Sequence, residues 1–456
     1  MPFSPGGRRP DLLASACAGL ILLATTANAQ PDEGFATDRV APTSEPSATP
    51  TSLPLPAAIR FALENNPSLA TQRRQRGIAA ARVVIADTYP FNPMLETRVQ
   101  RASGPENAGI TNRYPVEALF LWEVEIRGQR RARREGAAAG LSRTEWEVAA
   151  AEQAVAAQVI KTYAGFQYRR EKLRLLDETL KLNERLVEDV RRLVDAGRLR
   201  PSDLIVAKTE VSDTLDFQSA GREAEVAARQ DLLRALGLVD EKFDTEGPFE
   251  PPAWAPDAPA LAEMATARRA DLQARKLAVT EAAAAVRLAN ANRYGNPVVG
   301  AVYTYDPTKI TMIGPQVNLP LPVANTNRGQ VFQAEVEHAL AADSLRQTEV
   351  TVRQDVASGL ARLAAAEARA EQYRARILPD LRRAVEDMER LFQAGDVDLL
   401  RVIDVRRKLL RGRDGYLDAL WSVRQARADL TAAVGEPALG LVMPEEPPAR
   451  MGAPKK

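Results

Sequence analysis

Two regions of the chain alternate apolar and polar residues with a period of two, which is typical of β-strands. The first region has one side that is entirely apolar and another that carries three carboxylates: Val116, Ala118, Phe120, Trp122, Val124 and Ile126 alternate with Glu117, Leu119, Leu121, Glu123 and Glu125. The apolar positions of the second region are Val299, Ala301, Tyr303, Tyr305, Ile313, Val317, Leu319 and Leu321. A polar turn at 104–112 comes before the first region, and one at 306–309 lies within the second. Each turn joins a pair of strands, and the two pairs lie at about 91–127 and 297–322.

Two much longer stretches, about 128–196 and 328–394, follow a helical period. In the first, apolar residues recur every seven positions, as in a coiled coil: Leu173, Leu180, Val187 and Val194 form one seam, and Leu176, Asn183 and Val190 fill the other. At about 1.5 Å per residue each helix is a rod roughly 100 Å long, which needs neighbouring rods to cover it. Pro379 lies inside the second rod and should kink it.

Shorter helices are predicted before the strands, at about 55–88 and 259–294, and after the long helices, at about 201–236 and 398–434. Asn92-Pro93 and Asn296-Pro297 end the first two, because the residue before a proline is pushed out of the helical region. In each copy, the two shorter helices together match the length of the long helix.

The same order of elements occurs twice, so the chain is a duplication. Gly395 follows Gly197 by 198 residues, and Gly435 follows Gly237 by the same distance. We therefore divide the chain into two copies of one unit, with a Pro-rich linker between them. The divisions are a signal peptide at 1–29, a disordered leader at 30–53, a first repeat at 54–237, a linker at 238–258, a second repeat at 259–436 and a flexible tail at 437–456.

The N-terminus and the charge balance narrow the range of possible functions. Arg8-Arg9, an apolar run and the small residues before Gln30 predict a cleaved secretory signal peptide. Cys17, the only cysteine, lies inside this peptide, so the mature chain has no thiol for a disulfide or a Cys-ligated metal. The residues around Cys17 are unlike those of a lipidation site. The mature chain carries 59 basic and 59 acidic residues, and a net charge of zero argues against a nucleic-acid partner.

Four strands per chain cannot close a barrel, and an open sheet edge cannot face lipid. Bacterial membrane barrels have an even number of strands, eight or more. Two chains would supply eight strands and three would supply twelve, with enough rods in the second case to wall a hollow tube. The fold class predicted is mainly α with a small β part, in which several copies build a membrane barrel continued by a tube of coiled helices.

Three segments in order make the mature chain resemble the TolC-type outer-membrane efflux proteins over about 54–436. They are LPAAIRFALENNPSLATQRR, VNLPLPVANTNRGQ and ILPDLRRAVEDMERLFQAGDVDLLRVIDVRRKLL. The text NLPLPVANTNRG is most similar to the cobalt–zinc–cadmium resistance (CzcC-like) branch. One departure is Leu391-Phe392, where the family often has a tyrosine before the glycine turn; we interpret it as a packing variation.

The resemblance implies a homotrimer with a twelve-stranded β-barrel in the outer membrane and a periplasmic α-helical tunnel. It also implies docking onto a periplasmic adaptor and an inner-membrane pump, which we expect to be proton-driven. The function predicted is a passive exit channel of a tripartite efflux system that needs no cofactor. Divalent heavy-metal cations are the cargo that the branch suggests.

The candidate site residues lie at the two ends of this architecture. At the turns after the long helices, Gly197, Arg198, Gly395 and Asp396 would form the periplasmic tip where an adaptor docks, besides their role in capping the helices. Asp398 and Asp404 are candidates for a carboxylate ring at the tunnel mouth, although an aspartate at a helix start is also favoured by the helix dipole alone. The strand aromatics Phe120, Trp122, Tyr303 and Tyr305 are expected to face lipid or to form a girdle, rather than to pack in a core.

No catalytic or metal-binding pattern is present in the sequence. His338, the only histidine, is expected to be packed or solvated, since a metal site normally needs several histidine or cysteine ligands. Three alternatives remain open: a drug-efflux channel, a type I protein-secretion channel, and a periplasmic adaptor or coiled-coil scaffold. An adaptor would have one helical hairpin and would lack the duplicated strand pairs.

Overall fold

The structure is a computed structural model that describes residues 52–104, 109–241, 243–323 and 325–437. The predicted signal peptide, the leader up to residue 51 and the tail from residue 438 lie outside the described residues. The chain divides into two units, Met1–Pro50 and Thr51–Lys456, and every described residue belongs to the second.

The described residues form the same series of elements twice. The first repeat contains α2 (Leu55–Asn65), α3 (Pro67–Asp87), β2 (Met94–Val99), β3 (Val116–Glu123), α4 (Gln129–Asp195) and α5 (Pro201–Leu236). The second contains α6 (Ala258–Arg268), α7 (Ala270–Ala291), β5 (Val298–Tyr305), β6 (Thr311–Asn318), α8 (Arg328–Gln372), a π-helical turn η2 (Tyr373–Ile377), α9 (Leu378–Ala394) and α10 (Leu399–Val434). The predicted fold class, mainly α with a small sheet in a duplicated unit, is confirmed.

The first helix of each repeat is broken in two, so the single helices predicted at 55–88 and 259–294 are wrong. In the first repeat Asn66 precedes Pro67 and has an extended backbone (φ −68°, ψ 120°), because proline excludes the helical region for its predecessor. The Asn66 side chain then caps α3 by accepting hydrogen bonds from the amides of Ser68 and Leu69, at 3.0 and 3.4 Å. In the second repeat the break is at Arg269, without a proline.

The two long helices differ in continuity. α4 runs for 67 residues without interruption. The second rod changes at Tyr373–Ile377 into a π-helical turn, and Pro379 stands in the first turn of the helix that follows. A proline lacks the amide hydrogen and collides with the carbonyl four residues earlier, and a π turn absorbs this conflict by inserting one residue. The kink predicted at Pro379 stays a prediction, and the structure shows a π turn just ahead of the proline.

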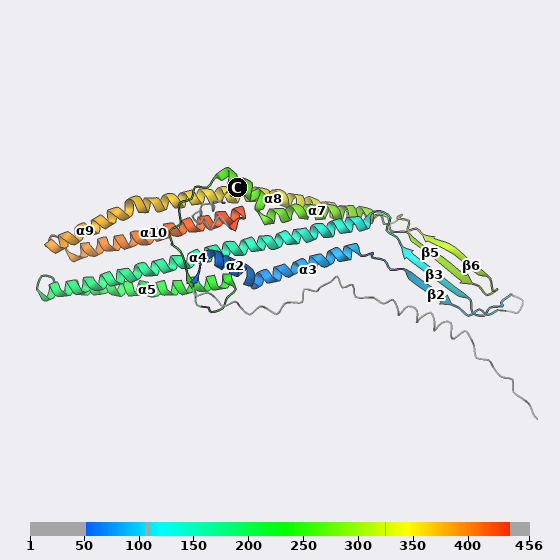
Figure 1. Cartoon of the computed structure of the whole chain (residues 1–456), viewed down its shortest axis with the longest axis horizontal. Coiled ribbons are helices and arrows are strands. Elements are labelled where there is room, and N and C mark those ends of the chain that lie inside the picture. The colour runs from blue at the N-terminus through cyan, green and yellow to red at the C-terminus, as the bar shows by residue number, and fades with distance from the viewer. Residues whose placement is uncertain (1–51, 105–108, 242, 324, 438–456) are drawn as a thin grey trace, which may run out of the picture. The chain divides into compact units, whose positions relative to one another are not determined.

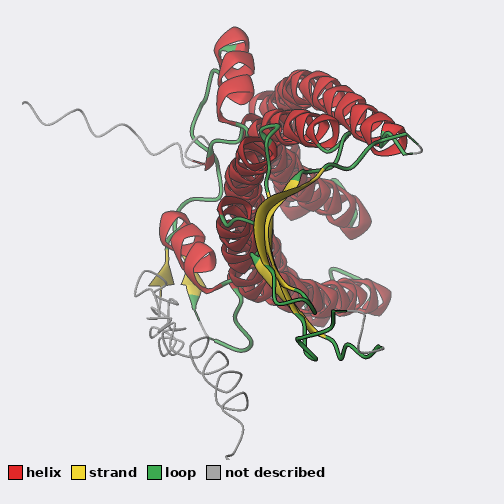
Figure 2. Cartoon of the chain, turned by 90° about the vertical axis from the view of Figure 1, so that its right-hand side faces the viewer, coloured by secondary structure: helices red, strands yellow, loops and turns green. Residues whose placement is uncertain are grey.

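The helices lie side by side in one curved layer (Figures 1 and 2). α3 and α5 lie end to end along α4, and α7 and α10 lie end to end along the second rod (Figure 1). This arrangement agrees with the prediction that two half-length helices together match one long helix. α4 is central, since it packs against α3, α5, α7 and α10. Among the described residues, no helix combines the length and the apolar character needed to cross a membrane.

One antiparallel sheet joins the strands of both repeats in the order β2-β3-β5-β6. β3 pairs with β5, so the two repeats meet in the middle of the sheet, and β2 and β6 are its edges. β3 ends at Glu123, which leaves the predicted strand positions Val124, Glu125 and Ile126 outside the sheet.

The linker between the repeats is packed against the helices, a feature that its Pro-rich composition did not predict. Its strand β4 (Asp244–Thr245) pairs with β1 (Ser52–Leu53) from the end of the leader. The buried Tyr163 hydroxyl lies 2.9 Å from the carbonyl oxygens of Leu53 and Glu246 and accepts a hydrogen bond from the Glu246 amide. Arg424 donates to the carbonyls of Phe249 and Pro248. Burial lowers the pKa of this guanidinium to about 10.

Candidate functional site: the sheet and the helical tip

The strand register sorts the sheet into two faces of different chemistry. Residues directly opposite each other on neighbouring strands point to the same side. Because Leu95 faces Phe120 and Phe120 faces Ala301, the register extends one face across all four strands. That face carries no charge: Leu95, Thr97, Val99, Val116, Ala118, Phe120, Trp122, Val299, Ala301, Tyr303, Tyr305, Thr311, Ile313, Pro315 and Val317.

The four predicted strand aromatics all lie on this uncharged face. Phe120, Trp122 and Tyr303 are 47, 41 and 39 % exposed, whereas Tyr305 is half-buried. Trp122 also contacts Tyr89, just before the sheet, with the rings edge to face at 5.8 Å between centroids. Phe120, Trp122 and Tyr303 are thus on a surface that this chain leaves open, and their exposure to lipid stays a prediction.

The opposite face of the sheet carries all of its charges. Arg98 contacts Glu96 and Glu117 at 3.2 and 3.3 Å. Near the helices, the side-chain amide of Asn296 donates to Glu123 at 2.9 Å. The third carboxylate predicted on this face, Glu125, lies beyond the strand and pairs with Arg133 instead.

The turns predicted to form the tip close both long helices in the same way. Gly197 and Gly395 have left-handed backbones, with φ of 72° and 86°. The next amides, of Arg198 and Asp396, donate back to Leu193 and Leu391 at 2.8 and 2.9 Å, which satisfies carbonyls at the helix ends. A Cβ added at either glycine would meet nothing within 4 Å. Both turns lie at the end of the helical layer far from the sheet (Figure 1).

Asp398 and Asp404 line one depression of about 400 Å³ between α9 and α10. Asp398 is the N-cap of α10 and accepts a hydrogen bond from the Arg401 amide at 3.2 Å. Asp404 pairs with Lys408 at 2.8 Å, and this contact lowers the pKa of the carboxyl. The structure therefore places both aspartates together and exposed, and it gives each of them a local partner.

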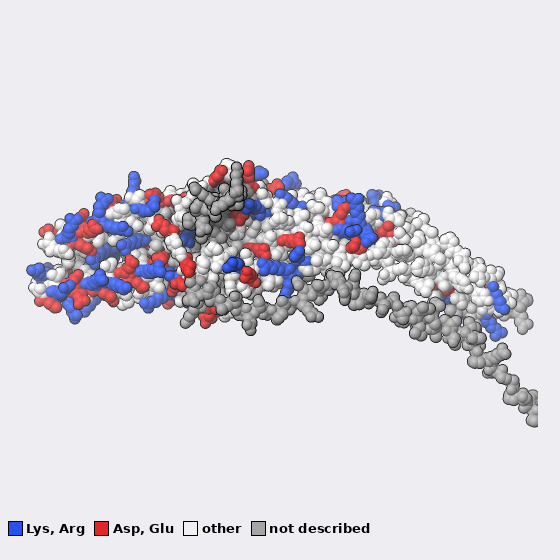
Figure 3. Space-filling view, viewed as in Figure 1, with Lys and Arg blue, Asp and Glu red and all other residues white. Residues whose placement is uncertain are grey.

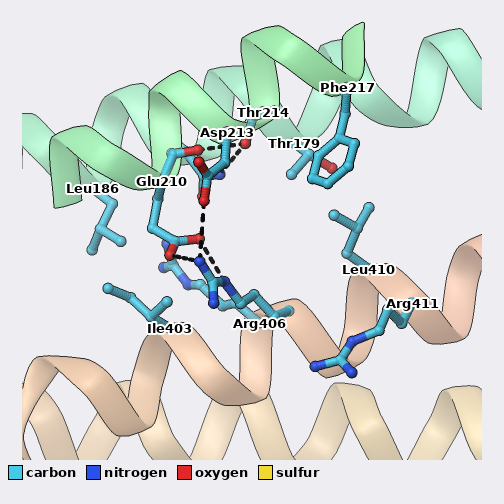
Figure 4. A pocket seen from close by; sticks show the side chains of 12 residues that line it. Thr179, Leu186, Glu210, Asp213, Thr214, Phe217, Ile403, Arg406, Leu410 and Arg411 are labelled. Atoms are coloured by element: carbon cyan, nitrogen blue, oxygen red, sulfur yellow. Dashed lines mark hydrogen bonds and ion pairs between the residues drawn. The ribbon is translucent and has the colours of Figure 1, made fainter. Parts of the chain in front are cut away.

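A polar cluster between the repeats was not singled out in the sequence (Figure 4). On α10, Arg407 donates from Nε to the almost buried Glu210 of α5 at 2.9 Å and also contacts Asp213. Beside it, Asn183 of the predicted α4 seam donates to Thr214 at 2.9 Å. These groups border a cavity of about 360 Å³. The polar Asn183 within an apolar seam was the available signal.

A second charged cluster joins α4 to α10 nearer the middle of the layer. Lys172 contacts Asp414 and Asp418 at 2.9 and 2.8 Å, and the Tyr168 hydroxyl donates to Asp418 at 2.5 Å. Burial opposes the charge of Asp418, but the hydrogen bonds from Lys172 and Tyr168 prevail and lower its pKa. Burial likewise opposes the charge of Lys172, and the hydrogen bonds from its partners raise the pKa above the usual range.

No group of three or more potential metal ligands occurs within the described residues. His338 is half-buried on α8.

A two-faced sheet that continues into a curved layer of long helices is the architecture of an outer-membrane channel. The outer membrane efflux protein model matches residues 58–238 and 261–436. The chain belongs to the outer membrane efflux protein family, which confirms the resemblance and the predicted efflux-channel function. Proteins of this family are passive channels, so the chain is a channel and not an enzyme.

The chain is also similar to individual proteins of known sequence or structure. The chain is 24 % identical to the cobalt-zinc-cadmium resistance protein CzcC of Cupriavidus metallidurans, over 84 % of this chain and 90 % of the relative. Its fold is similar to crystal structures of CusC, with a TM-score of 0.70, 18 % identity and coverage of 84 and 92 % of the two chains. The outer membrane protein VceC of Vibrio cholerae gives a TM-score of 0.68, 18 % identity and coverage of 84 and 96 %.

Proposed function

We propose that three copies of this chain form the outer-membrane exit duct of a tripartite efflux system. The observation that carries the proposal is a sheet with one uncharged face, one charged face and two free edges. Strands from three copies close one cylindrical sheet with the uncharged face toward lipid and the charged face toward water, since a free edge cannot remain in hydrocarbon. The curved helical layers of the copies complete the periplasmic tunnel below it.

The outermost helices near the sheet support the assembly. α3 exposes Ile78 and Ile85 at 61 and 70 %, and α8 exposes Phe332 and Leu340, both at 68 %. These two helices lie at opposite margins of the layer, because α3 packs on α4 and α8 packs on α7. Apolar stripes at both margins are what a ring of identical subunits requires, since each margin is covered by the other margin of the next copy.

Disulfide cross-linking tests the ring. Ile85 is two residues from the sheet-side end of α3, and Phe332 is four residues from the sheet-side start of α8. The mature chain has no cysteine of its own, since Cys17 lies in the predicted signal peptide. An Ile85→Cys, Phe332→Cys double variant should give covalent trimers in outer-membrane fractions. Each single variant serves as a control, and a ladder that stops at dimers would contradict the trimer.

The cargo that we propose is a divalent heavy-metal cation. Its support is the likeness to CzcC, and the charged sheet face adds carboxylates to the conduit. The test is growth on zinc, cobalt and cadmium of a host whose own channel gene has been replaced by this one, with the cognate pump present. Rescue on metals without rescue on drugs supports the proposal, whereas rescue on drugs alone favours a drug-efflux channel.

At the tip we propose that the turns containing Gly197, Arg198, Gly395 and Asp396 dock a periplasmic adaptor, and that Asp398 and Asp404 form a ring around the mouth. The ring is tested with an Asp398→Asn, Asp404→Asn double variant, because asparagine keeps the N-cap while the charge is removed. Cation selectivity in a planar bilayer should fall. Unchanged conductance and selectivity would remove the ring, and the duct would stand.

A further inference from the structure

At the border between the sheet and the helices, the guanidinium groups of two arginines lie over the ring of one tyrosine. The Arg127 guanidinium lies 4.2 Å from the centroid of the Tyr294 ring, and that of Arg293 lies 5.8 Å from the same centroid. Arg127 comes from the link between β3 and α4, and the other two residues from the link between α7 and β5. The fold therefore brings two cations together from different repeats.

Neither cation is neutralised within the described chain. The four arginines at the start of α4 have acidic partners: Arg130 and Arg134 contact Asp87, Arg131 contacts Glu135, and Arg133 contacts Glu125. Arg127 and Arg293 form no ion pair with any described residue. Two uncompensated like charges at one ring repel each other, so an anion between or beside them would stabilise the arrangement.

The way the arginines are held leaves their hydrogen-bond donors available. A guanidinium stacked on an aromatic ring is fixed by its face, while its N–H groups point outward around the edge. Such edges match the oxygens of a phosphate, which two arginines can bind with several charge-assisted hydrogen bonds. Tyr294 itself is 40 % exposed, so the ring does not bury the arginines.

The position of the two arginines next to the sheet indicates which kind of phosphate group they meet. Figure 3 shows charged side chains gathering at this end of the helices, whereas the adjoining region of the sheet is largely uncharged. Trp122 and Tyr89 lie at the same border. An aromatic border next to an uncharged sheet face marks the membrane surface, and basic residues at that level attract anionic headgroups.

We propose that Arg127 and Arg293, held on Tyr294, bind the phosphate of an anionic phospholipid headgroup at the periplasmic surface of the outer membrane. The sequence Arg127-Gly128-Gln129 recurs in the second repeat as Arg328-Gly329-Gln330, at the start of α8, and Arg328 also forms no ion pair with described residues. The inference rests on the proposed membrane duct.

The test is native mass spectrometry of the mature trimer in neutral detergent, titrated with dioleoylphosphatidylglycerol or with dioleoylphosphatidylcholine. The wild type should bind the anionic lipid more tightly, and an Arg127→Gln, Arg293→Gln variant should bind it about tenfold more weakly. The matched control is Arg191→Gln, Arg382→Gln, which removes two arginines near the tip that have no ion pair with described residues and should leave the affinity unchanged. An Arg127→Lys, Arg293→Lys variant keeps the charge but loses the planar guanidinium groups, and its affinity should fall between those of the wild type and the glutamine variant.

Equal binding of phosphatidylglycerol by the wild type and the glutamine variant would overturn the proposal, as would an equal loss in the control. Sodium phosphate is the third probe, and if it displaces the lipid at equal concentration the site is a general anion site and the lipid assignment fails. Single-channel conductance separates this inference from the proposed function. A glutamine variant that conducts normally but no longer prefers the anionic lipid supports both, whereas a wild type that does not conduct refutes the duct itself.

Discussion

The two long rods occupy the same place in the two repeats and yet differ in the middle. α4 is continuous, whereas its counterpart is divided by η2 ahead of Pro379. The residue of α4 that corresponds to Pro379 is Lys181, at the same separation of 198 that relates the two turn glycines. α4 is the central rod, with helices on both sides, and the second rod lies at the margin of the layer. The interruption therefore occurs in the rod at the margin and not in the central one.

The half-length helices repeat the contrast. Opposite η2, α10 carries Gly412 and Gly415, and a Cβ added there would come within 2.6 Å of Leu381 and of the Tyr373 hydroxyl. The matching positions in α5 are Thr214 and Phe217, which border the cavity of Figure 4. The second pair of helices is therefore packed closely around its π turn, whereas Thr214 and Phe217 lie beside a cavity shared with α10.

The largest effect is expected from moving the proline into the continuous rod. Lys181→Pro should lower the free energy of unfolding by about 3 kcal/mol or more, because an interior proline removes a hydrogen bond and collides with the preceding turn. Thermal unfolding followed by circular dichroism, together with the yield of trimer, measures this. Lys181→Ala is the control and should change little. A proline variant as stable as the wild type would show that α4 tolerates interruption as the second rod does.

Removing Lys172 should weaken the junction between the repeats by about 2 kcal/mol, because Asp414, Asp418 and Tyr168 lose a charged donor. The variant that tests this is Lys172→Met. Its control is Lys208→Met, at an exposed lysine that has no ion pair with described residues.

The effect depends on pH. The lowered pKa of Asp418 means that its contribution is present above the unfolded-state pKa of about 3.9 and is lost as the pH falls through the folded-state value. The difference in melting temperature between wild type and Lys172→Met should therefore shrink when the pH is lowered from 7 to 3. A constant difference would place the effect outside this cluster.

Filling the close contact at the π turn should cost about 1–2 kcal/mol. Gly415→Ala places a methyl group against the Tyr373 hydroxyl, which must shift together with its ring. Gly77→Ala is the control, since nothing lies within 4 Å of the added atom, and alanine in place of an open helical glycine should be neutral or stabilising. Equal effects of the two changes on the melting temperature would indicate that the close approach of α10 to η2 does not matter.

The smallest effect is expected from Pro379→Ala, which restores an amide to the second rod. Stability should change by less than about 1 kcal/mol, and amide hydrogens in residues 373–379 should exchange more slowly as the turn becomes regular helix. Unchanged exchange in that segment would mean that the packing of Tyr373 on α10, and not the proline, maintains the π turn.

Much of the fold could be predicted because its signals are local. The alternation around Phe120 and Trp122 predicted a strand, and the coiled-coil seam through Leu180 and Val187 predicted a long helix; both are present. The break at Arg269 could not be predicted in the same way, because neither a proline nor a change in composition marks it. There Gln153 of α4 meets the helix ends, bonding the carbonyls of Arg268 and Gly435 and the amide of Ala270.

The sequence by itself determined the duplication, the rods, the strand faces and the turns at Gly197 and Gly395, since each depends on neighbours a few residues away or on the repeat of a local pattern. Only the tertiary structure decided which residues meet across the repeats. Arg407 reaches Glu210, Lys172 reaches Asp418, and Arg127 reaches Tyr294. These pairings depend on how segments far apart in the sequence are placed side by side, and side-chain periodicity carries no information about that placement.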